Sequence, residues 1–175
     1  EANSASLLRL FDDVLEVAYL DQTGDLPRCD VTALNGLCND CVESVLPELH
    51  PGVSLLGELT PDDPVVRTNL KRIEQVLLRL LRNAAKFTLS GHITLTYDCL
   101  PAERLLRFSV TDTGPGIPDV EQAMQEGYST AGQTARELGF GAGMGLPNMK
   151  RYSDEMTIDT EVGKGTTVTV KIKVS

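Results

Sequence analysis

The sequence predicts a domain of the α+β class, and three patterns lead to this prediction. Residues 69–87 place apolar side chains around most of the circumference of a helix. Residues 92–99 and 104–111 form two strand-like runs that are separated by a short turn containing Pro101. Residues 156–174 form two further runs on either side of a Gly-Lys-Gly turn, which is typical of a β-hairpin.

The composition indicates a soluble, globular protein with one main domain. Of the 175 residues, 41% are hydrophobic and 23% are charged, so the chain can bury a core without disulfides or metals. Its net charge of −9 and isoelectric point near 4.7 argue against binding to nucleic acid or to anionic membranes. The sequence contains no bilayer-length apolar run and no signal-peptide pattern, so we expect a cytoplasmic protein without direct membrane contact.

The four cysteines are expected to be free, packed thiols. Cys38 and Cys41 form a CxxC pattern, but they lie within a predicted helix, and no second pair with metal-ligand spacing follows them. A disulfide or a metal site is the less favoured alternative. His50 and His92 lie beside Pro and Gly in predicted loops, and we interpret both as surface residues.

The chain is expected to begin with an amphipathic helix at residues 6–20, because apolar residues recur there at helical spacing. Residues 22–25 then form a short hinge. The helix could dock on the core of its own domain, or it could be the tail of a longer helix that pairs with another chain. We therefore divide the protein into an N-terminal helix and hinge, residues 1–24, and a main domain, residues 25–175.

The next elements are expected to be scaffold. We predict a strand at residues 28–31, a helix at 32–46, a strand at 53–59 and a short extended piece at 65–68. None of these elements carries a motif for chemistry.

The helix at residues 69–87 has a narrow polar stripe on an otherwise apolar surface. Its polar residues are Gln75, Arg79, Arg82, Asn83 and Lys86. Burying such residues without partners would cost several kcal/mol, so the stripe is expected to face water or a ligand. The stripe itself contains no acid at i,i+4 spacing, which favours an anionic ligand over an exposed edge with paired charges.

The strand at residues 104–111 ends in Asp112, which is followed by Gly114, Gly116 and two prolines. Glycine allows a ligand to approach the main chain, so an acid at this break is placed to contact a ligand. The alternative is a surface turn in which Asp112 caps its own backbone. Pro118 suits the first turn of a short helix, with Asp119 near its positive end.

Residues 127–145 lose periodicity and gain glycine, and a helix is predicted directly afterwards at 146–152. A loop of this length within a domain is usually a lid or a binding loop. Glycines before a helix expose backbone N–H groups that can bind phosphate. The alternative is a flexible linker, since the spacing matches neither a Walker-type phosphate loop nor a dinucleotide fingerprint.

Three motifs therefore occur in one order: residues 82–88, residues 112–117 and residues 141–146. Together they resemble the ATP-site motifs of the gyrase, heat-shock chaperone, histidine kinase and mismatch-repair superfamily, over about residues 28–174. The resemblance implies a two-layer α/β sandwich of the Bergerat ATP-binding type, with a mixed, mostly antiparallel sheet and helices on one face. Residues 6–118 resemble the catalytic domain of a sensor histidine kinase, whereas residues 119–174 resemble the anti-sigma-factor serine kinases.

The resemblance implies ATP and Mg²⁺ as cofactors and assigns roles to individual residues. Asp112 would accept a hydrogen bond from the adenine amino group, Gly116 would let the base lie against the backbone, and Thr166 would act through water. Asn83 would be the Mg²⁺ ligand. Lys86 and Arg82 would offset the phosphate charge. The remaining nucleotide-binding residues would be Gly114, Ile117, Gly141, Gly143, Met144, Gly145 and Leu146.

One position departs from the pattern. Arg79 lies one turn before Asn83, where histidine kinases have Asn and the hydrolysing branches have a Glu that acts as general base. This argues against efficient ATP hydrolysis and against the usual way of holding Mg²⁺, and we assign no general base.

The function implied by the resemblance is that of a two-component sensor histidine kinase. Its ATP-binding domain would transfer the γ-phosphoryl group to a histidine outside this chain and act with a response regulator. The protein would be cytoplasmic or the cytosolic part of a membrane-bound sensor, and it could form a homodimer through the N-terminal helix. The alternative is an anti-sigma-type switch or serine kinase that acts on a sigma-factor or anti-sigma partner. A third interpretation keeps the fold but has a pocket that binds no nucleotide.

Overall fold

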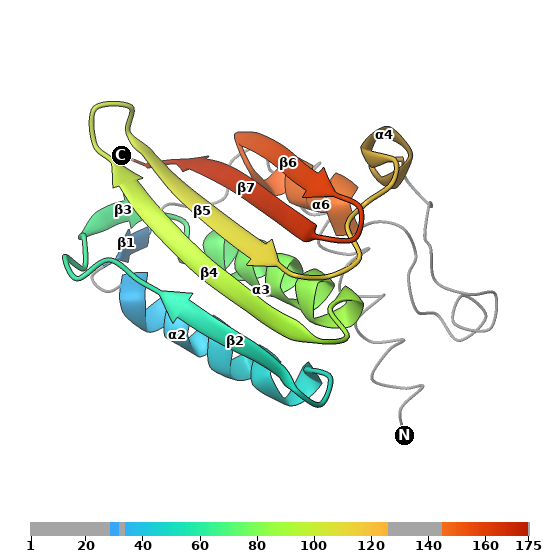
Figure 1. Cartoon of the computed structure of the whole chain (residues 1–175). Helices are drawn as coiled ribbons and strands as arrows, with labels where there is room; N and C mark the ends of the chain where they lie inside the picture. Colours follow the sequence, from blue (N-terminus) through green and yellow to red (C-terminus); the bar gives the residue numbers. More distant parts are fainter. Residues whose placement is uncertain (1–28, 32–33, 126–144, 175) are drawn as a thin grey trace, which may run out of the picture.

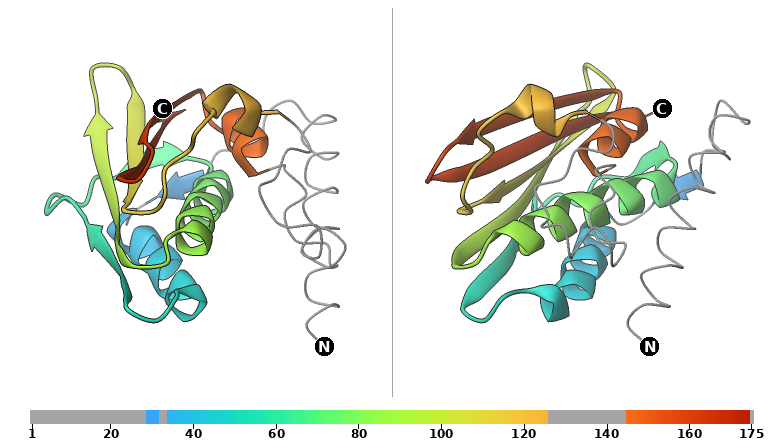
Figure 2. Two further views of the ribbon diagram at one scale, coloured as in Figure 1. Left: turned by 45° about the vertical axis from the view of Figure 1, so that its right-hand side comes forward. Right: turned by 90° about the vertical axis from the view of Figure 1, so that its right-hand side faces the viewer.

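The computed structural model describes residues 29–31, 34–125 and 145–174. These residues form two layers, a β-sheet and a set of helices that cover one of its faces (Figures 1 and 2). The α+β class and the two-layer sandwich predicted from the sequence are confirmed.

The helices and strands follow the predicted order, with ends that differ from the predicted ones by one or two residues. The elements are β1 Cys29–Val31, α2 Leu34–Val45, the 3₁₀ helix η1 Leu46–Glu48, β2 Val53–Glu58, β3 Val66–Thr68, α3 Leu70–Phe87, β4 Gly91–Leu100, β5 Leu105–Asp112, α4 Val120–Ala123, α6 Gly145–Tyr152, β6 Glu155–Glu161 and β7 Gly165–Lys173. The N-terminal helix expected at residues 6–20 and most of the glycine-rich loop expected at 127–145 lie outside the described residues.

The main sheet has five strands in the order β2-β4-β5-β7-β6. Strand β2 pairs with β4 in parallel, while the β4–β5, β5–β7 and β6–β7 pairs are antiparallel. The sheet is therefore mixed and mostly antiparallel, as expected. A separate two-stranded antiparallel sheet of β1 and β3 was not predicted from the sequence.

Helix α3 is the centre of the core. Its N-cap is Asn69, whose side-chain oxygen accepts a hydrogen bond of 3.0 Å from the Arg72 backbone N–H. Its apolar side chains pack between helices α2 and α6 and the inner face of the sheet (Figure 2). The buried residues of α3 are Ile73, Val76, Leu77, Leu80, Leu81, Ala84 and Ala85. This burial fixes which side of α3 remains for polar residues.

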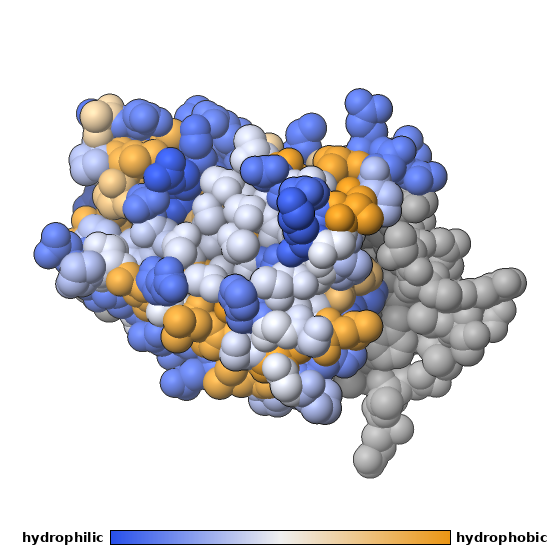
Figure 3. Space-filling view, in the orientation of Figure 1, coloured by the Kyte–Doolittle hydropathy of each residue, from blue (hydrophilic) through white to orange (hydrophobic). Residues whose placement is uncertain are grey.

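The outer face of the sheet is polar and faces the viewer in Figures 1 and 3. Hydroxyl pairs cross its central strands, with 2.9 Å between Ser109 Oγ and Thr169 Oγ1 and 3.0 Å between Thr111 Oγ1 and Thr167 Oγ1. The pale surface over the middle of Figure 3 corresponds to such residues of intermediate hydropathy. An antiparallel sheet with one solvated face alternates in this way between apolar and polar side chains.

The thiols of Cys38 and Cys41 are free and buried on the inner side of α2. Burial raises the pKa of each thiol to about 12, because a thiolate in an apolar surrounding loses its hydration. Cys99, in β4, is also free. The prediction of free thiols is confirmed for these three cysteines.

Within the described ranges, none of the helices combines the length and the apolar character that a membrane span requires.

Candidate functional site

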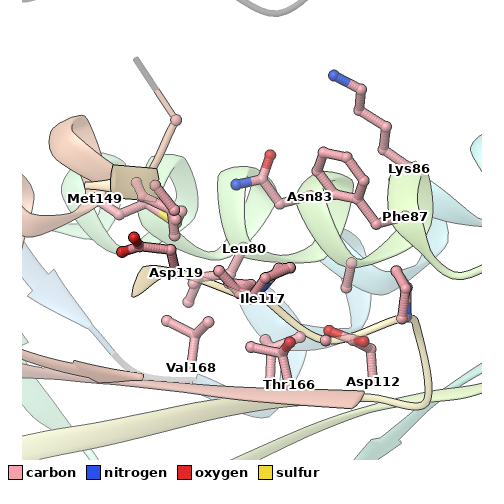
Figure 4. A pocket seen from close by; sticks show the side chains of 18 of the residues that line it. Leu80, Asn83, Lys86, Phe87, Asp112, Ile117, Asp119, Met149, Thr166 and Val168 are labelled. Carbon is pink, nitrogen blue, oxygen red and sulfur yellow. The ribbon is translucent and has the colours of Figure 1, made fainter. Parts of the chain in front are cut away.

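A cavity of about 420 Å³ lies between the C-terminal half of α3, the ends of β5 and β7, and the segment after β5 (Figure 4). Its size falls within the range of roughly 300–1,000 Å³ that is usual for small-molecule sites. The lining residues are Leu80, Asn83, Ala84, Lys86, Phe87, Val110, Asp112, Pro115, Gly116, Ile117, Pro118, Asp119, Gln122, Ala123, Gly145, Leu146, Met149, Thr166 and Val168. Described residues from each of the three sequence motifs therefore line one cavity.

Asp112 is the last residue of β5 and lines the cavity from the sheet side. The Gly114 backbone N–H donates a hydrogen bond of 2.8 Å to Asp112 Oδ1, and the Thr166 backbone N–H also bonds to this carboxylate. Burial raises the pKa of Asp112 above its ordinary value, while these two N–H bonds act in the opposite direction.

The capped turn and the ligand-facing acid, which the sequence left as alternatives, are compatible in the structure. A carboxylate has about four acceptor positions. Because the backbone occupies two of those of Asp112, acceptor capacity remains toward the cavity.

A cluster of hydroxyl and backbone bonds holds the cavity wall against β6 and β7. The Thr160 hydroxyl accepts a hydrogen bond of 2.8 Å from the Ile117 N–H and lies 3.1 Å from the Gly165 carbonyl oxygen. Its Oγ1 is also 3.0 Å from Thr166 Oγ1. The position of Ile117 in the cavity therefore depends on the β6–β7 hairpin.

Gly116 is required by a close backbone approach in this wall. Its φ is +75°, and a Cβ placed on it would lie 2.4 Å from the carbonyl oxygen of Glu161. The adjacent Pro115 carbonyl accepts a hydrogen bond of 2.8 Å from the Gly163 N–H. The fold itself therefore requires glycine at position 116, in addition to the contact with the base that the resemblance implies.

Asn83 and Lys86 line the cavity from the opposite side, on α3 (Figure 4). The Asn83 side chain also lies against the start of α6, since a Cβ on Gly145 would be 3.1 Å from Asn83 Nδ2. Lys86 is exposed at the rim, and its Nζ is 5.1 Å from the centroid of the Phe87 ring. Both polar groups are therefore available at the open side of the cavity.

Arg82 was expected from the sequence to offset the phosphate charge. It does not line the cavity, and its Nε is 3.0 Å from Glu48 Oε1 on η1. The polar stripe of α3 lacks an acid of its own, but the fold brings one from 34 residues earlier in the chain. The case for an anionic ligand therefore rests on Asn83 and Lys86 and no longer on Arg82.

Arg79 also lies away from the cavity lining, although it is one turn before Asn83. Its guanidinium carbon is 5.6 Å from the centroid of the Tyr152 ring at the end of α6. This cation–π contact joins α3 to the helix that begins at Gly145 and contributes to cavity lining through Leu146 and Met149.

Replacement of Arg82 tests its separation from the cavity. We expect Arg82→Ala to lower the free energy of unfolding by up to about 1 kcal/mol, because it breaks only a half-exposed ion pair. Glu48→Gln should have a similar effect. Nucleotide affinity, measured by calorimetry, should stay within about twofold of wild type in both variants. A tenfold loss of affinity in Arg82→Ala alone would show that Arg82 contacts the nucleotide.

The cavity includes residues that sequence reasoning did not assign to it. Leu80, Met149 and Val168 supply apolar walls, and Asp119 and Gln122 supply polar groups from α4 and its N-cap. The helical spacing of Leu80 to Asn83 and of Leu146 to Met149 is a signal that could have identified two of them.

Of the predicted site residues, Asn83, Lys86, Asp112, Gly116, Ile117, Gly145, Leu146 and Thr166 line the cavity. Gly114 adjoins it through its bond to Asp112. Gly141, Gly143 and Met144 lie outside the described residues. Among the described residues, no group of three or more His, Cys, Asp or Glu side chains could hold a metal ion.

Comparison with known proteins identifies relatives of two kinds. The family described as "Histidine kinase-, DNA gyrase B-, and HSP90-like ATPase" matches residues 68–175. Histidine protein kinase DivJ of Caulobacter vibrioides is 35% identical over 182 residues, covering 96% of this chain and 29% of DivJ. Serine/threonine-protein kinase RsbT of Bacillus subtilis is 33% identical over 97 residues, covering 55% of this chain and 67% of RsbT.

Among solved structures, full-length ShkA in complex with AMPPNP superposes with a TM-score of 0.81 at 29% identity, over 97% of this chain and 36% of ShkA. The adaptive-response sensory kinase SasA of a Synechococcus strain is 28% identical over 89% of this chain. The chain spans 42% of that SasA sequence and 29% of DivJ, so it corresponds to a part of these longer kinases.

Proposed function

This chain belongs to the family of histidine kinase-, DNA gyrase B- and HSP90-like ATPases, and we propose that it is the ATP-binding catalytic domain of a two-component sensor histidine kinase. In this proposal it transfers the γ-phosphoryl group of ATP to a histidine outside this chain. One observation carries the proposal: a carboxylate on the sheet and an amide on α3 line the same cavity, and a lysine of α3 stands at its rim.

The inner end of the cavity fits an adenine. Leu80 on α3, Val168 on β7 and Ile117 after β5 provide apolar surfaces for a flat base. Asp112 keeps acceptor capacity toward the cavity, and its two backbone N–H partners fix its orientation. Asp112 therefore accepts a hydrogen bond from the adenine amino group in this proposal, and Thr166 lies beside it for a contact through water.

The α3 side of the cavity fits phosphates and a magnesium ion. The side-chain oxygen of Asn83 is a hard ligand of the kind that Mg²⁺ prefers, and Lys86 offers a positive charge at the open rim. Because the described residues offer no cluster of three acidic or imidazole ligands, phosphate oxygens would complete the coordination. When bound, Mg²⁺ would offset the negative charge of the phosphates.

Phosphoryl transfer requires positioning and charge neutralisation more than covalent chemistry by the protein. Asp112 would fix the base, while Asn83 and Lys86 would orient the phosphates toward an acceptor. Neither His50 nor His92 lies on a helix, so neither has the helical context with acidic and proline residues of a phosphoacceptor, and the acceptor lies on another segment or protein. The partners in this proposal are a phosphoacceptor histidine domain and a response regulator, and the site of action is the cytoplasm.

The test supplies the chain with a dimerisation hairpin that a related kinase is known to phosphorylate, together with γ-labelled ATP and Mg²⁺. The expected result is label on the histidine of the hairpin, in a bond that acid hydrolyses. Asp112→Ala serves as the negative control. Binding of ATP without any transfer to a competent hairpin would contradict the kinase assignment while leaving the nucleotide site in place.

A second function, serine phosphorylation of a protein partner, is favoured by the similarity to RsbT over 97 residues. The same labelling experiment separates the two functions, because phosphoserine survives acid treatment and phosphohistidine does not. Acid-stable label on a sigma-factor or anti-sigma partner would favour the RsbT-like alternative.

Replacing Arg79 tests whether this residue has taken the place of a magnesium ligand. Arg79→Asn would place a second amide one helical turn before Asn83, so we expect the Mg²⁺-dependent gain in ATP affinity to increase. Loss of the contact with Tyr152 should cost about 0.5–2 kcal/mol of stability, whereas Arg79→Lys should retain part of it. An unchanged Mg²⁺ dependence in calorimetric titrations would show that Arg79 has not displaced a metal ligand.

A further inference from the structure

The cavity contains a second carboxylate that the proposed ATP site does not yet use. Asp119 precedes α4, and its Oδ1 accepts a hydrogen bond of 2.9 Å from the Gln122 backbone N–H. This bond caps α4 and fixes the orientation of the carboxylate. Asp119 is one of the residues that line the cavity, and Figure 4 shows its carboxylate below Met149, at the opposite end of the cavity from Asp112.

Asp119 is exposed, and its carboxylate lacks a charge partner among the described residues. No salt bridge to this carboxylate occurs within the part of the chain that the structure describes. An ionised carboxylate can only accept hydrogen bonds, so a ligand beside its second oxygen must present a donor or a cation. Phosphate oxygens provide neither and would repel it.

The chemistry of ATP limits what Asp119 can contact. Besides the amino group of the base, the only uncharged donors on ATP are the 2′- and 3′-hydroxyls of the ribose. Asp112 lies at one end of the segment that walls the cavity, and Asp119 lies at the other end, with Ile117 between them. If the base lies at Asp112, as proposed above, a ribose that extends along this segment comes beside Asp119.

We propose that Asp119 accepts hydrogen bonds from the ribose hydroxyls and makes the site selective for ribonucleotides over deoxyribonucleotides. This inference rests on the proposed nucleotide site and deepens it. Carboxylates bind ribose hydroxyls in the same way in dinucleotide-binding folds. The α4 cap and the sugar contact use the two oxygens of one side chain, so the short helix α4 serves to position an acceptor.

The test compares calorimetric affinities for ATP, 2′-deoxy-ATP and 3′-deoxy-ATP, each with and without Mg²⁺. Wild type is expected to bind ATP about tenfold more tightly than either deoxynucleotide, as for a hydrogen bond to a charged group. In Asp119→Ser, which retains an N-capping side chain, ATP affinity should fall to the deoxynucleotide level while deoxynucleotide affinity stays unchanged. Asp119→Asn keeps the cap through its single oxygen but presents an NH₂ group in place of the second oxygen, so it should lose most of the discrimination as well.

Glu121→Gln is the matched control, because Glu121 is an exposed acid on α4 that does not line the cavity. It should bind all three nucleotides as wild type does. Equal discrimination in wild type and Asp119→Ser would overturn the proposal. A loss of ATP affinity in Asp119→Ser that appears only with Mg²⁺ would also overturn the proposal, because it would show that Asp119 contacts the metal ion. Failure of wild type to bind ATP at all would instead contradict the nucleotide site itself.

Discussion

Asp112→Asn and Asp112→Ala are expected to weaken Mg·ATP binding by about 10- to 100-fold, or roughly 1.5–3 kcal/mol. Asp112 is the acceptor that faces the cavity from the sheet, and its orientation is fixed by the N–H groups of Gly114 and Thr166. Asparagine would present a donor where the adenine amino group also presents one. Isothermal titration calorimetry measures the loss directly, and unchanged affinity in both variants would remove Asp112 from the site.

The pH dependence of binding provides an independent check on Asp112. Burial raises its pKa above the usual value for an aspartic acid, so protonation begins at a higher pH than for an exposed acid. Since the neutral carboxyl group is a weaker acceptor, affinity should decline as the pH falls through this raised pKa. Asp98→Asn is the matched control, because Asp98 pairs with Arg107 at the surface and should leave affinity and its pH profile unchanged.

Gly165→Ala is expected to lower the free energy of unfolding by about 2–4 kcal/mol. Its φ is +136°, and a Cβ at this position would lie in severe overlap with the backbone carbonyl oxygen of Asp112. The substitution would therefore push β7 away from the end of β5. Urea unfolding monitored by circular dichroism measures the change, and nucleotide affinity should fall with it because Asp112 is displaced.

Gly163→Ala is the control for the backbone part of this effect. Gly163 has a φ of +82° in the same hairpin, but nothing lies within 4 Å of the position of its Cβ. Gly163→Ala should lower the free energy of unfolding by only about 1 kcal/mol, because only the strain of the left-handed conformation contributes. Similar losses in the two variants would show that the close approach at Gly165 does not limit stability.

Periodicity was sufficient to predict the elements of the described fold. Helix α3 is apolar around most of its circumference because it packs between the sheet and two other helices, and this burial leaves a clear 3.6-residue pattern. Strands β4 to β7 alternate because one face of the sheet is solvated. The short strands β1 and β3 pair across more than 30 residues, and no local pattern encodes such a contact.

The candidate site was predicted where glycines and an acid interrupt a pattern, and it was missed where contacts depend on the fold. Asp112 stands at such a position, Asn83 was predicted from the polar stripe of α3, and both line one cavity. For Arg82, the sequence could not show an ion pair with Glu48, because that partner comes from another element. Asp119 was interpreted only as a residue near the start of a helix, since a capping acid and a cavity-lining acid look the same in a sequence.

The buried thiols of α2 offer a way to observe how often the helical layer separates. With the pKa raised to about 12 and no access from solvent, Cys38 and Cys41 cannot react with an alkylating reagent while α2 rests on its neighbours. The rate at which these two thiols are alkylated in the native protein therefore measures how often α2 separates transiently from α3. A ligand that stabilises the packing of α2 on α3 would slow this rate.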